Sequence, residues 1–221
     1  MNRLVITMGD PCGVGPEIIV KFFDGIYKVE DKRLFLVVVG SKSVLEYYKK
    51  KLRIDLEIVE ITKAHIVDGK LENGKLHLIN IDTDIDKLEF GKHTELGGAL
   101  SIKYLDKAIE LCHGKYVDGI VTCPISKDSI NMAGFKYSGH TEYLAEKSKT
   151  EDFAMVLKGK KVVVLLNSTH VSLKEAINRV TKESVLNKIR LAQKAKKELG
   201  LTGSIAVAGL NPHNGENGLF G

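Results

Sequence analysis

The sequence is poor in the patterns that mark several classes of protein. It has no tryptophan, and aromatic residues make up only 6% of its 221 residues. A nucleic-acid-binding surface needs clustered basic residues with interleaved aromatics, whereas the lysines here are spread along helix-like stretches and are typical of solvated helix faces. No apolar run approaches the roughly 18 residues that cross a bilayer, and the first residues lack the apolar core of a signal peptide. We therefore expect neither a nucleic-acid nor a membrane partner.

Cysteine is also scarce. The three cysteines, Cys12, Cys112 and Cys123, form no C-x-x-C pair. A sparse, odd set is typical of a reducing compartment, so we expect a cytoplasmic protein. The net charge of +5 comes from 33 basic and 28 acidic residues, and 43% of the chain is hydrophobic. This composition suits a globular protein with one large domain or two small ones.

Short apolar runs alternate with stretches of helical period. Seven runs rich in Val, Ile and Leu predict strands that are covered on both faces. They span residues 3–8, 34–40, 56–61, 118–123, 153–158, 161–167 and 204–209. Helices are expected between them, most clearly over 95–114 and over 181–200, where Gly200 fits a helix end. This alternation predicts an α/β fold with a largely parallel sheet.

Two further features bear on the organisation of the chain. Asn73-Gly74 lies between two shorter apolar runs, which predicts a β-hairpin that projects from the main sheet. No repeat, low-complexity tract or linker divides the sequence. Any second domain is therefore expected to be interwoven with the first.

Polar residues follow the predicted strands, and open α/β sheets bind ligands at the carboxyl ends of their strands. After the first strand, "MGDPCGVGPEI" places Gly13 and Gly15 in a tight turn, with Pro16 at the start of a helix. The stretch lacks the third glycine of the dinucleotide fingerprint and the Gly-Lys-Ser/Thr of a P-loop. It is either a plain strand-to-helix connection or a site that binds an anion at a helix N-terminus.

Two later stretches carry a cation or an imidazole. In "VTCPISKDSI", Lys127 follows a strand exit and either holds a phosphate or carboxylate as a point charge or is a solvated surface lysine. In "YSGHTEYLA", His140 and Thr141 begin a helix, where an imidazole, a hydroxyl and backbone N–H groups can cradle a phosphate. Capping by Ser138 or Thr141 is the alternative. Because His140 adds nothing to a cap, a ligand-binding role is favoured.

Two more histidines, His170 and His213, each follow an apolar run. A single histidine after a strand is commonly a hydrogen-bonded loop residue, but two at equivalent places in one sheet can share a divalent metal. We predict that they lie within a few ångströms of each other at the carboxyl edge of the sheet. Zinc usually takes three or four protein ligands, so two do not complete a site. The remaining histidines are expected to be structural or surface residues: His65, His77, His93 and His113.

Four motifs in order, "GDPCGVGPEI", "SGHTEYLA", "STHVSL" and "GLNPHNGENG", resemble the 4-hydroxythreonine-4-phosphate dehydrogenase family of vitamin B6 biosynthesis. The resemblance runs from the first predicted strand to the last residue. It implies a fold similar to isocitrate and isopropylmalate dehydrogenases, with two interwoven α/β subdomains over residues 1–221 and no confident internal boundary. It also implies a homodimer with a shared active site, and NAD or NADP bound without the Rossmann fingerprint.

By the same resemblance, His140 and Thr141 bind the substrate near its phosphate. His170 and His213 are ligands of zinc, magnesium or cobalt, and Lys127 is a catalytic residue near the reacting groups. The implied reaction oxidises 4-phosphooxy-L-threonine by hydride transfer to NAD(P)+, and decarboxylation then gives 3-amino-2-oxopropyl phosphate. A metal beside the alcohol eases its deprotonation and polarises the new carbonyl.

The sequence departs from this pattern in two ways. Cys12 stands where relatives usually carry alanine, and family chains continue past Gly221 with a third metal histidine and further substrate contacts. The resemblance therefore implies a truncated form with little or no dehydrogenase activity. Three alternatives stay open: a dehydrogenase of 4-phospho-D-threonate or 4-phospho-D-erythronate, an inactive phosphate-ligand-binding or dimerisation fragment, and an acyl-phosphate transferase. The last does not account for His170 and His213 as a pair.

Overall fold

The computed structural model describes residues 2–25, 34–69, 72, 74–137 and 139–220. The chain divides into two compact units, Met1–Ser148 and Lys149–Gly221. The interweaving of two subdomains stays a prediction. None of the helices in the described ranges is long and apolar enough to cross a membrane.

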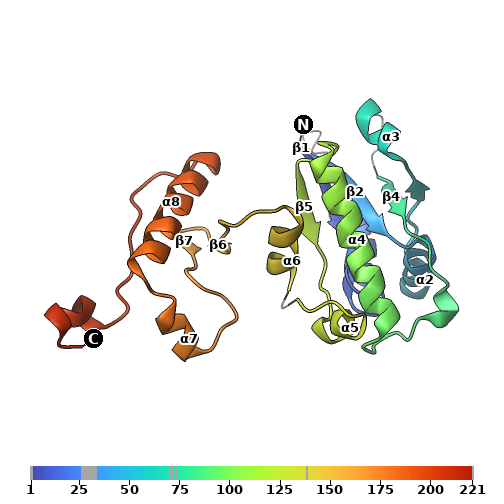
Figure 1. The fold of residues 1–221 in the computed structure, drawn as a ribbon. Coiled ribbons are helices and arrows are strands. Elements are labelled where there is room, and N and C mark those ends of the chain that lie inside the picture. Colours follow the sequence, from blue (N-terminus) through green and yellow to red (C-terminus); the bar gives the residue numbers. More distant parts are fainter. Residues whose placement is uncertain (1, 26–33, 70–71, 73, 138, 221) are drawn as a thin grey trace. The chain divides into compact units, whose positions relative to one another are not determined.

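The first unit contains a five-stranded sheet with the order β3-β4-β2-β1-β5 (Figure 1). Every pair of neighbouring strands in it is parallel, which confirms the predicted parallel sheet. The strands are β1 (Asn2–Thr7), β2 (Leu34–Gly40), β3 (Ile58–Glu60), β4 (Leu76–Asn80) and β5 (Gly119–Thr122). Four of them coincide with predicted runs, and β4 is an addition.

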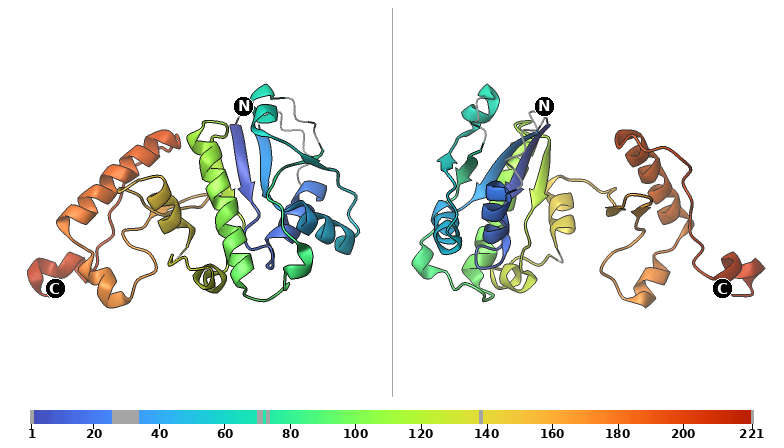
Figure 2. Two further views of the ribbon diagram at one scale, coloured as in Figure 1. Left: turned by 45° about the vertical axis from the view of Figure 1, so that its right-hand side comes forward. Right: turned by 180° about the vertical axis from the view of Figure 1, so that it is seen from behind.

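Helices cover both faces of this sheet. Helix α4 lies across one face, and α1 lies on the opposite face (Figures 1 and 2). The predicted apolar stripe of α4 is buried, with Tyr104, Ala108 and Leu111 fully inaccessible. The helices of the unit are α1 (Gly15–Gly25), α2 (Lys42–Leu52), α3 (Lys63–Asp68), η1 (Ile85–Lys87), α4 (Glu95–His113), α5 (Lys127–Met132) and α6 (His140–Lys147).

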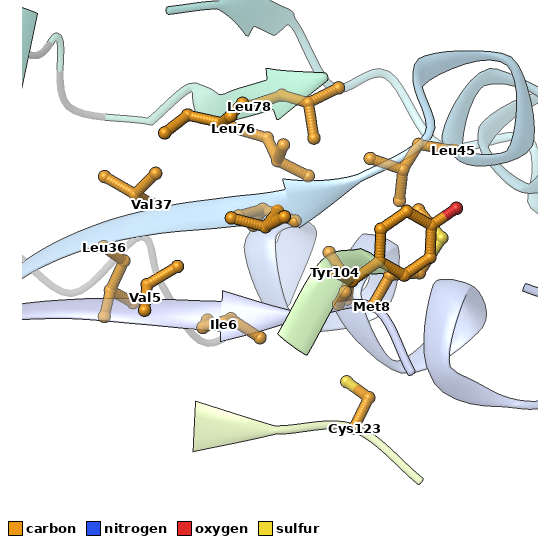
Figure 3. Close-up of a cluster of buried hydrophobic side chains, with 14 of the residues drawn as sticks. Val5, Ile6, Met8, Leu36, Val37, Leu45, Leu76, Leu78, Tyr104 and Cys123 are labelled. Carbon is orange, nitrogen blue, oxygen red and sulfur yellow. The ribbon is translucent and has the colours of Figure 1, made fainter. Parts of the chain in front are cut away.

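The core of the first unit lies between the sheet and these helices. Figure 3 shows Val5 of β1, Val37 of β2, Leu78 of β4 and Tyr104 of α4 among the side chains of one buried hydrophobic cluster. All four side chains are fully buried, and burying each one stabilises the fold by roughly 1.5–3 kcal/mol. Because both faces of the sheet are covered, the strands are continuous apolar runs rather than alternating ones.

The predicted hairpin is wrong in its second arm. Strand β4 pairs in parallel with both β2 and β3, so Leu76–Asn80 lies inside the main sheet. This pairing buries Leu76 and Leu78 completely, which a projecting hairpin would leave in water. Asn73 and most of the first arm lie outside the described residues.

Helix α6 is attached to α4 through Tyr143. The ring of Tyr143 is 1% exposed, and its edge meets the ring of Tyr137 with centroids 4.8 Å apart. Its hydroxyl donates a hydrogen bond to the carboxylate of Asp106 on α4. Burial and this carboxylate raise the pKa of Tyr143, so the phenol remains a neutral donor.

The described part of the second unit has a two-stranded antiparallel sheet, two α-helices and a 3-10 segment. Its elements are β6 (Val156–Lys158), β7 (Val163–Leu165), α7 (Leu173–Asn178), α8 (Lys182–Glu198) and η2 (Pro212–Gly218). Thr181 caps α8 and exchanges hydrogen bonds with Ser184. Gly200 has a φ of 62°, and the N–H of Leu201 donates to the carbonyl of Lys196 at 2.9 Å. This geometry confirms Gly200 as the helix end.

One expectation for this unit is wrong. The stretch 204–209 forms no strand, because no other strand in the described part of the unit pairs with it and Val207 remains 60% exposed. Strands β6 and β7 lie within the predicted runs 153–158 and 161–167 and form an antiparallel pair, which a short direct connection allows. The apolar stripe of α8 is also only partly covered, and Leu199 is 47% exposed.

Removal of the Tyr143 hydroxyl tests how α6 is attached. Tyr143→Phe is expected to lower the free energy of unfolding by about 1.5 kcal/mol, because Asp106 loses a donor beside a buried ring. Urea unfolding followed by circular dichroism measures the change. Tyr137→Phe is the matched control, because its hydroxyl donates to Glu146 at 2.7 Å at an exposed position, and we expect a change within about 0.5 kcal/mol. Equal losses for the two variants would contradict this role of Tyr143.

Candidate functional site

The carboxyl ends of β1 and β5 are adjacent, since Thr7 pairs with Thr122 in the parallel register. The chain that leaves β1 stays next to the chain that leaves β5, and the N–H of Asp10 donates to the carbonyl of Pro124 at 3.0 Å. This exit carries the first group of candidate residues.

The glycine-rich turn after β1 is tightly packed. Gly9 has a φ of 73°, and a Cβ there would lie 2.2 Å from the carbonyl oxygen of Pro124. A Cβ on Gly15 would lie 2.0 Å from the carbonyl oxygen of Met8, whereas one on Gly13 would make ordinary contacts. Backbone oxygens therefore leave no room for a side chain at Gly9 or Gly15. This packing favours the plain strand-to-helix connection.

Asp10 is a buried carboxylate in this turn, with 5% exposure. One of its oxygens accepts the N–H of Cys12 at 2.9 Å, and the other accepts the hydroxyl of Ser129 at 3.0 Å. Ser129 in turn accepts the N–H of Thr94 at 3.3 Å. We call Asp10, Cys12, Thr94 and Ser129 the Asp10 cluster. It joins the exit of β1 to the first turns of α4 and α5.

Two glycines in the first turn of α4 make room for this cluster. A Cβ on Gly97 would lie 2.8 Å from a carboxylate oxygen of Asp10, and one on Gly98 would lie 1.9 Å from the carbonyl oxygen of Ser129. Thr94 caps the helix by accepting the N–H of Gly97 at 3.0 Å. The carboxylate therefore lies against the N-terminal end of α4, whose partial positive charge stabilises an anion.

Lys127 is the first residue of α5. The preceding Ser126 caps this helix by accepting the N–H of Ser129 at 3.1 Å, and its hydroxyl also lies 2.8 Å from Nδ1 of His93. Lys127 is exposed and forms no ion pair with any residue that the structure describes. Its ammonium group is thus available to a ligand, but its catalytic role stays a prediction.

His140 and Thr141 are the first two residues of α6, and both are partly buried. The Nε2 atom of His140 is buried and has no hydrogen-bond partner among the described residues. Burial lowers the pKa of His140 below its ordinary value of 6.5, so the imidazole is neutral at pH 7. No side chain in the described part caps α6, and Thr141 is therefore not the cap; Ser138 lies outside the described residues.

A second polar atom at the start of α6 is also without a partner in the described ranges, the Oε2 atom of Glu142. A buried polar atom left without a hydrogen bond costs roughly 1–3 kcal/mol, so such atoms are commonly met by water or a ligand. At the start of α6, two buried polar atoms without partners in the described ranges therefore lie at or next to the predicted substrate-binding residues His140 and Thr141.

His170 and His213 belong to the second unit. Both are exposed and both have left-handed backbones, with φ of 53° and 51°. A left-handed conformation costs a non-glycine residue roughly 1–2 kcal/mol and is found preferentially at functional sites. The ring of His213 lies 6.3 Å from that of Phe220, centroid to centroid.

Within the part of the chain that the structure describes, these two histidines do not belong to a complete metal site. In the described ranges, no group of three or more His, Cys, Asp or Glu residues is placed to hold a metal ion. His213 does not lie at a strand end, because the stretch 204–209 before it is not a strand. That the two rings lie within a few ångströms of each other stays a prediction.

Reasoning from the sequence missed the Asp10 cluster. A signal was present: an acidic residue stands three positions after the end of an apolar strand, and Ser126 and Thr94 each stand three residues before a residue whose N–H they cap. The link from Asp10 to Ser129, however, joins residues 119 positions apart. No local pattern reveals such a contact.

Comparison with known proteins identifies the family. Residues 32–221 match the profile of the family described as "Pyridoxal phosphate biosynthetic protein PdxA". A relative from Fusobacterium nucleatum, named "Putative D-threonate 4-phosphate dehydrogenase", is 41% identical over 221 residues, which are 100% of this chain and 65% of that protein. The 4-hydroxythreonine-4-phosphate dehydrogenase of a Sulfurihydrogenibium species is 40% identical over 223 residues, with 100% and 66% coverage. The chain thus spans less than two thirds of the length of these curated relatives.

The fold agrees with this match. The crystal structure of 4-hydroxythreonine-4-phosphate dehydrogenase from Klebsiella pneumoniae superposes with a TM-score of 0.87 at 32% identity, over 100% of this chain and 66% of that one. The expected isocitrate/isopropylmalate dehydrogenase-like α/β fold is thereby confirmed. The four motifs, the parallel sheet and the profile match lead to one conclusion: the chain belongs to the PdxA family.

Proposed function

We propose that this chain carries part of the active site of a dehydrogenase that acts on a small 4-phosphorylated hydroxy acid. The first candidate reaction oxidises 4-phosphooxy-L-threonine with NAD or NADP, and loss of CO2 then gives 3-amino-2-oxopropyl phosphate. The family match and the name of the Sulfurihydrogenibium relative support this choice. A homodimer with a shared active site and a cytoplasmic location belong to the same proposal.

The observation that carries the proposal is the unpartnered Nε2 of His140 beside Thr141 at the start of α6. Phosphate oxygens accept hydrogen bonds from backbone N–H groups at a helix start, from hydroxyls and from imidazole N–H groups. A phosphate held by His140 and Thr141 would give the buried imidazole nitrogen the partner it lacks. The neutral imidazole then binds the phosphate through a hydrogen bond from its N–H group, and not through a positive charge.

Lys127 is proposed as the cation of the reaction. A lysine ammonium is a compact point charge on a flexible stem and suits a carboxylate or phosphate oxygen. Its position at the start of α5 follows the exit of β5, where ligands bind in open α/β sheets. There it would hold the acid and balance negative charge on the reacting oxygens.

His170 and His213 are proposed as two ligands of a divalent metal, which is zinc, magnesium or cobalt. The imidazole donors fit zinc and cobalt better than magnesium, which prefers oxygen ligands. When bound, the metal would polarise the oxygen of the substrate alcohol. Since the described residues supply no third ligand, the two histidines are part of a ligand set. We assign no residue to the binding of NAD or NADP.

Ligand binding tests the role of the α6 start. His140→Asn and Thr141→Val are each expected to weaken the binding of 4-phosphooxy-L-threonine by about tenfold, the loss of one good hydrogen bond to a charged group. Isothermal titration calorimetry measures the dissociation constant. His113→Asn is the control, because His113 is an exposed histidine at the other end of the unit's long helix α4. Unchanged affinity in both site variants would contradict the proposal.

Metal binding tests the second unit separately. His170→Gln and His213→Gln are each expected to lower the affinity for cobalt by about tenfold or more, because an imidazole ligand is lost. The visible absorption of bound Co²⁺ reports the binding, and His113→Gln again serves as the control. If both site variants bind cobalt like the unaltered chain, the metal assignment is wrong.

A second candidate substrate is D-threonate 4-phosphate, with D-erythronate 4-phosphate as its close analogue. Relatives at 41% and 38% identity carry the name "Putative D-threonate 4-phosphate dehydrogenase", as against 40% for the relative named for 4-hydroxythreonine 4-phosphate. The D-threonate ester has a hydroxyl on the carbon where the threonine ester has an amine. Because these identities are nearly equal, they do not decide between the two candidate substrates.

Turnover of the substrates side by side decides between the candidates. Reduction of NAD and of NADP is measured with each acid in the presence of Zn²⁺, Mg²⁺ or Co²⁺. If 4-phosphooxy-L-threonine is the substrate, whatever weak reduction this chain supports is expected to have a kcat/KM at least about tenfold higher for it than for the D-threonate ester, because one unpaired polar contact changes binding by that order. The reverse ratio would assign the enzyme to the D-threonate ester. Tight binding of either acid without any reduction would favour a phosphate-ligand-binding module.

A further inference from the structure

The Asp10 cluster contains an unusual burial of charge. Asp10 is 5% exposed, and no lysine or arginine in the described part of the chain forms an ion pair with it. A buried carboxylate without a cation is costly, and two hydrogen bonds and the first turn of α4 only offset that cost. Apolar side chains of similar size commonly fill such a position at lower free energy. The arrangement therefore calls for a reason beyond stability.

The geometry of α5 supplies one. The hydroxyl of Ser129 bonds to Asp10, and the N–H of Ser129 bonds to the cap residue Ser126. Lys127 lies between Ser126 and Ser129, in the first turn of the same six-residue helix. Both neighbours are thus fixed by hydrogen bonds, one of them to a buried charge. The backbone of Lys127 has little freedom as long as the Asp10–Ser129 bond is present.

We propose that Asp10 is a positioning residue that acts through Ser129 to fix Lys127 at the carboxyl edge of the sheet. The inference rests on the proposed function, in which Lys127 holds the phosphorylated acid. Asp10 itself is too deeply buried to touch a ligand. The carboxylate thereby fixes the position of the Lys127 backbone, from which the flexible lysine side chain extends.

A merely structural role for the cluster predicts a different result. If the Asp10–Ser129 bond only stabilises the fold, its loss lowers the unfolding free energy but leaves the affinity for a ligand unchanged. If the bond positions Lys127, its loss also weakens ligand binding, and that effect needs the lysine to be present. The two roles are separated by affinity and by coupling to Lys127.

The chain offers a closely matched pair of variants. Ser129 and Ser101 are both fully buried, and each donates one hydroxyl hydrogen bond, Ser101 to the carbonyl of Gly97 at 2.7 Å. Ser101 lies on α4 and does not contact α5 through this bond. Ser129→Ala and Ser101→Ala therefore remove the same group from equally buried sites, and Ser129→Ala also removes the acceptor of the Thr94 N–H, which bonds at 3.3 Å. Only the first breaks the link to Asp10.

The experiment measures the dissociation constant of 4-phosphooxy-L-threonine by calorimetry, at a temperature where every variant is folded. Ser129→Ala is expected to weaken binding by about tenfold, and Ser101→Ala by less than about twofold. Asp10→Asn, which keeps the size but removes the charge, is expected to behave like Ser129→Ala. In a Lys127→Met background, Ser129→Ala is expected to have no further effect, as a double-mutant cycle requires for coupled residues.

A readout without ligand accompanies these titrations. The N–H of Ile130 donates to the carbonyl of Ser126 at 3.0 Å, and that of Ala133 donates to the carbonyl of Ser129 at 3.1 Å. Hydrogen exchange of these two amides is expected to be at least about tenfold faster in Ser129→Ala than in Ser101→Ala, because the first turn of α5 loses its anchor. Equal affinities of the two serine variants, or an undiminished effect of Ser129→Ala in the Lys127→Met background, would overturn the inference. If the unaltered chain binds no phosphorylated acid, the proposed function fails, and equal exchange rates in the two variants then refute the positioning role as well.

Discussion

Parallel pairing of β1 with β2 on one side and with β5 on the other is the constraint on which the first unit depends. Since parallel strands end at the same edge, the chain segments that leave β1 and β5 must run beside each other. Gly9 and Gly15 are needed because backbone atoms of Met8 and Pro124 occupy the space of their missing side chains. The same closeness brings Asp10 within hydrogen-bonding distance of Ser129. The arrangement of Lys127 follows from these contacts.

The sequence predicted the elements whose signal is local. The run 34–40 is strand β2 as the structure has it, and the apolar stripe of 95–114 is the buried face of α4. Strand β4 was misassigned because Asn73-Gly74 suggests a turn and because His77 interrupts its apolar residues, although His77 is itself buried. The choice between a hairpin and a central strand depends on pairing with β2, which lies far away in the chain. Ser204–Gly209 has the composition of a strand but no partner in the described part of its unit.

The candidate site follows the same division. Lys127, His140 and Thr141 were placed at helix starts by local sequence patterns, and the structure has them there. What the sequence could not reveal is the set of contacts that hold these helices: Asp10 with Ser129, and Tyr143 with Asp106. Each contact joins residues that are distant in the chain. The residue types indicated which side chains can bind a ligand. The positions of those side chains depend on tertiary hydrogen bonds.

The two units differ in what holds their candidate residues. In the first unit, a closed apolar core supports the strands that end at the Asp10 cluster. In the second unit, Gly215 alone is buried among the described residues, so hydrophobic burial contributes little to the loops of His170 and His213. Yet His213 begins a run of left-handed residues, held by local bonds such as that from Asn211 Nδ2 to the carbonyl of Phe220 at 2.7 Å. Asparagine and glycine within this run tolerate that conformation, whereas His213 and Glu216 are strained by it. Among the described residues, the conformation of His213 therefore depends on these local hydrogen bonds and on neighbours that tolerate a left-handed backbone, rather than on burial.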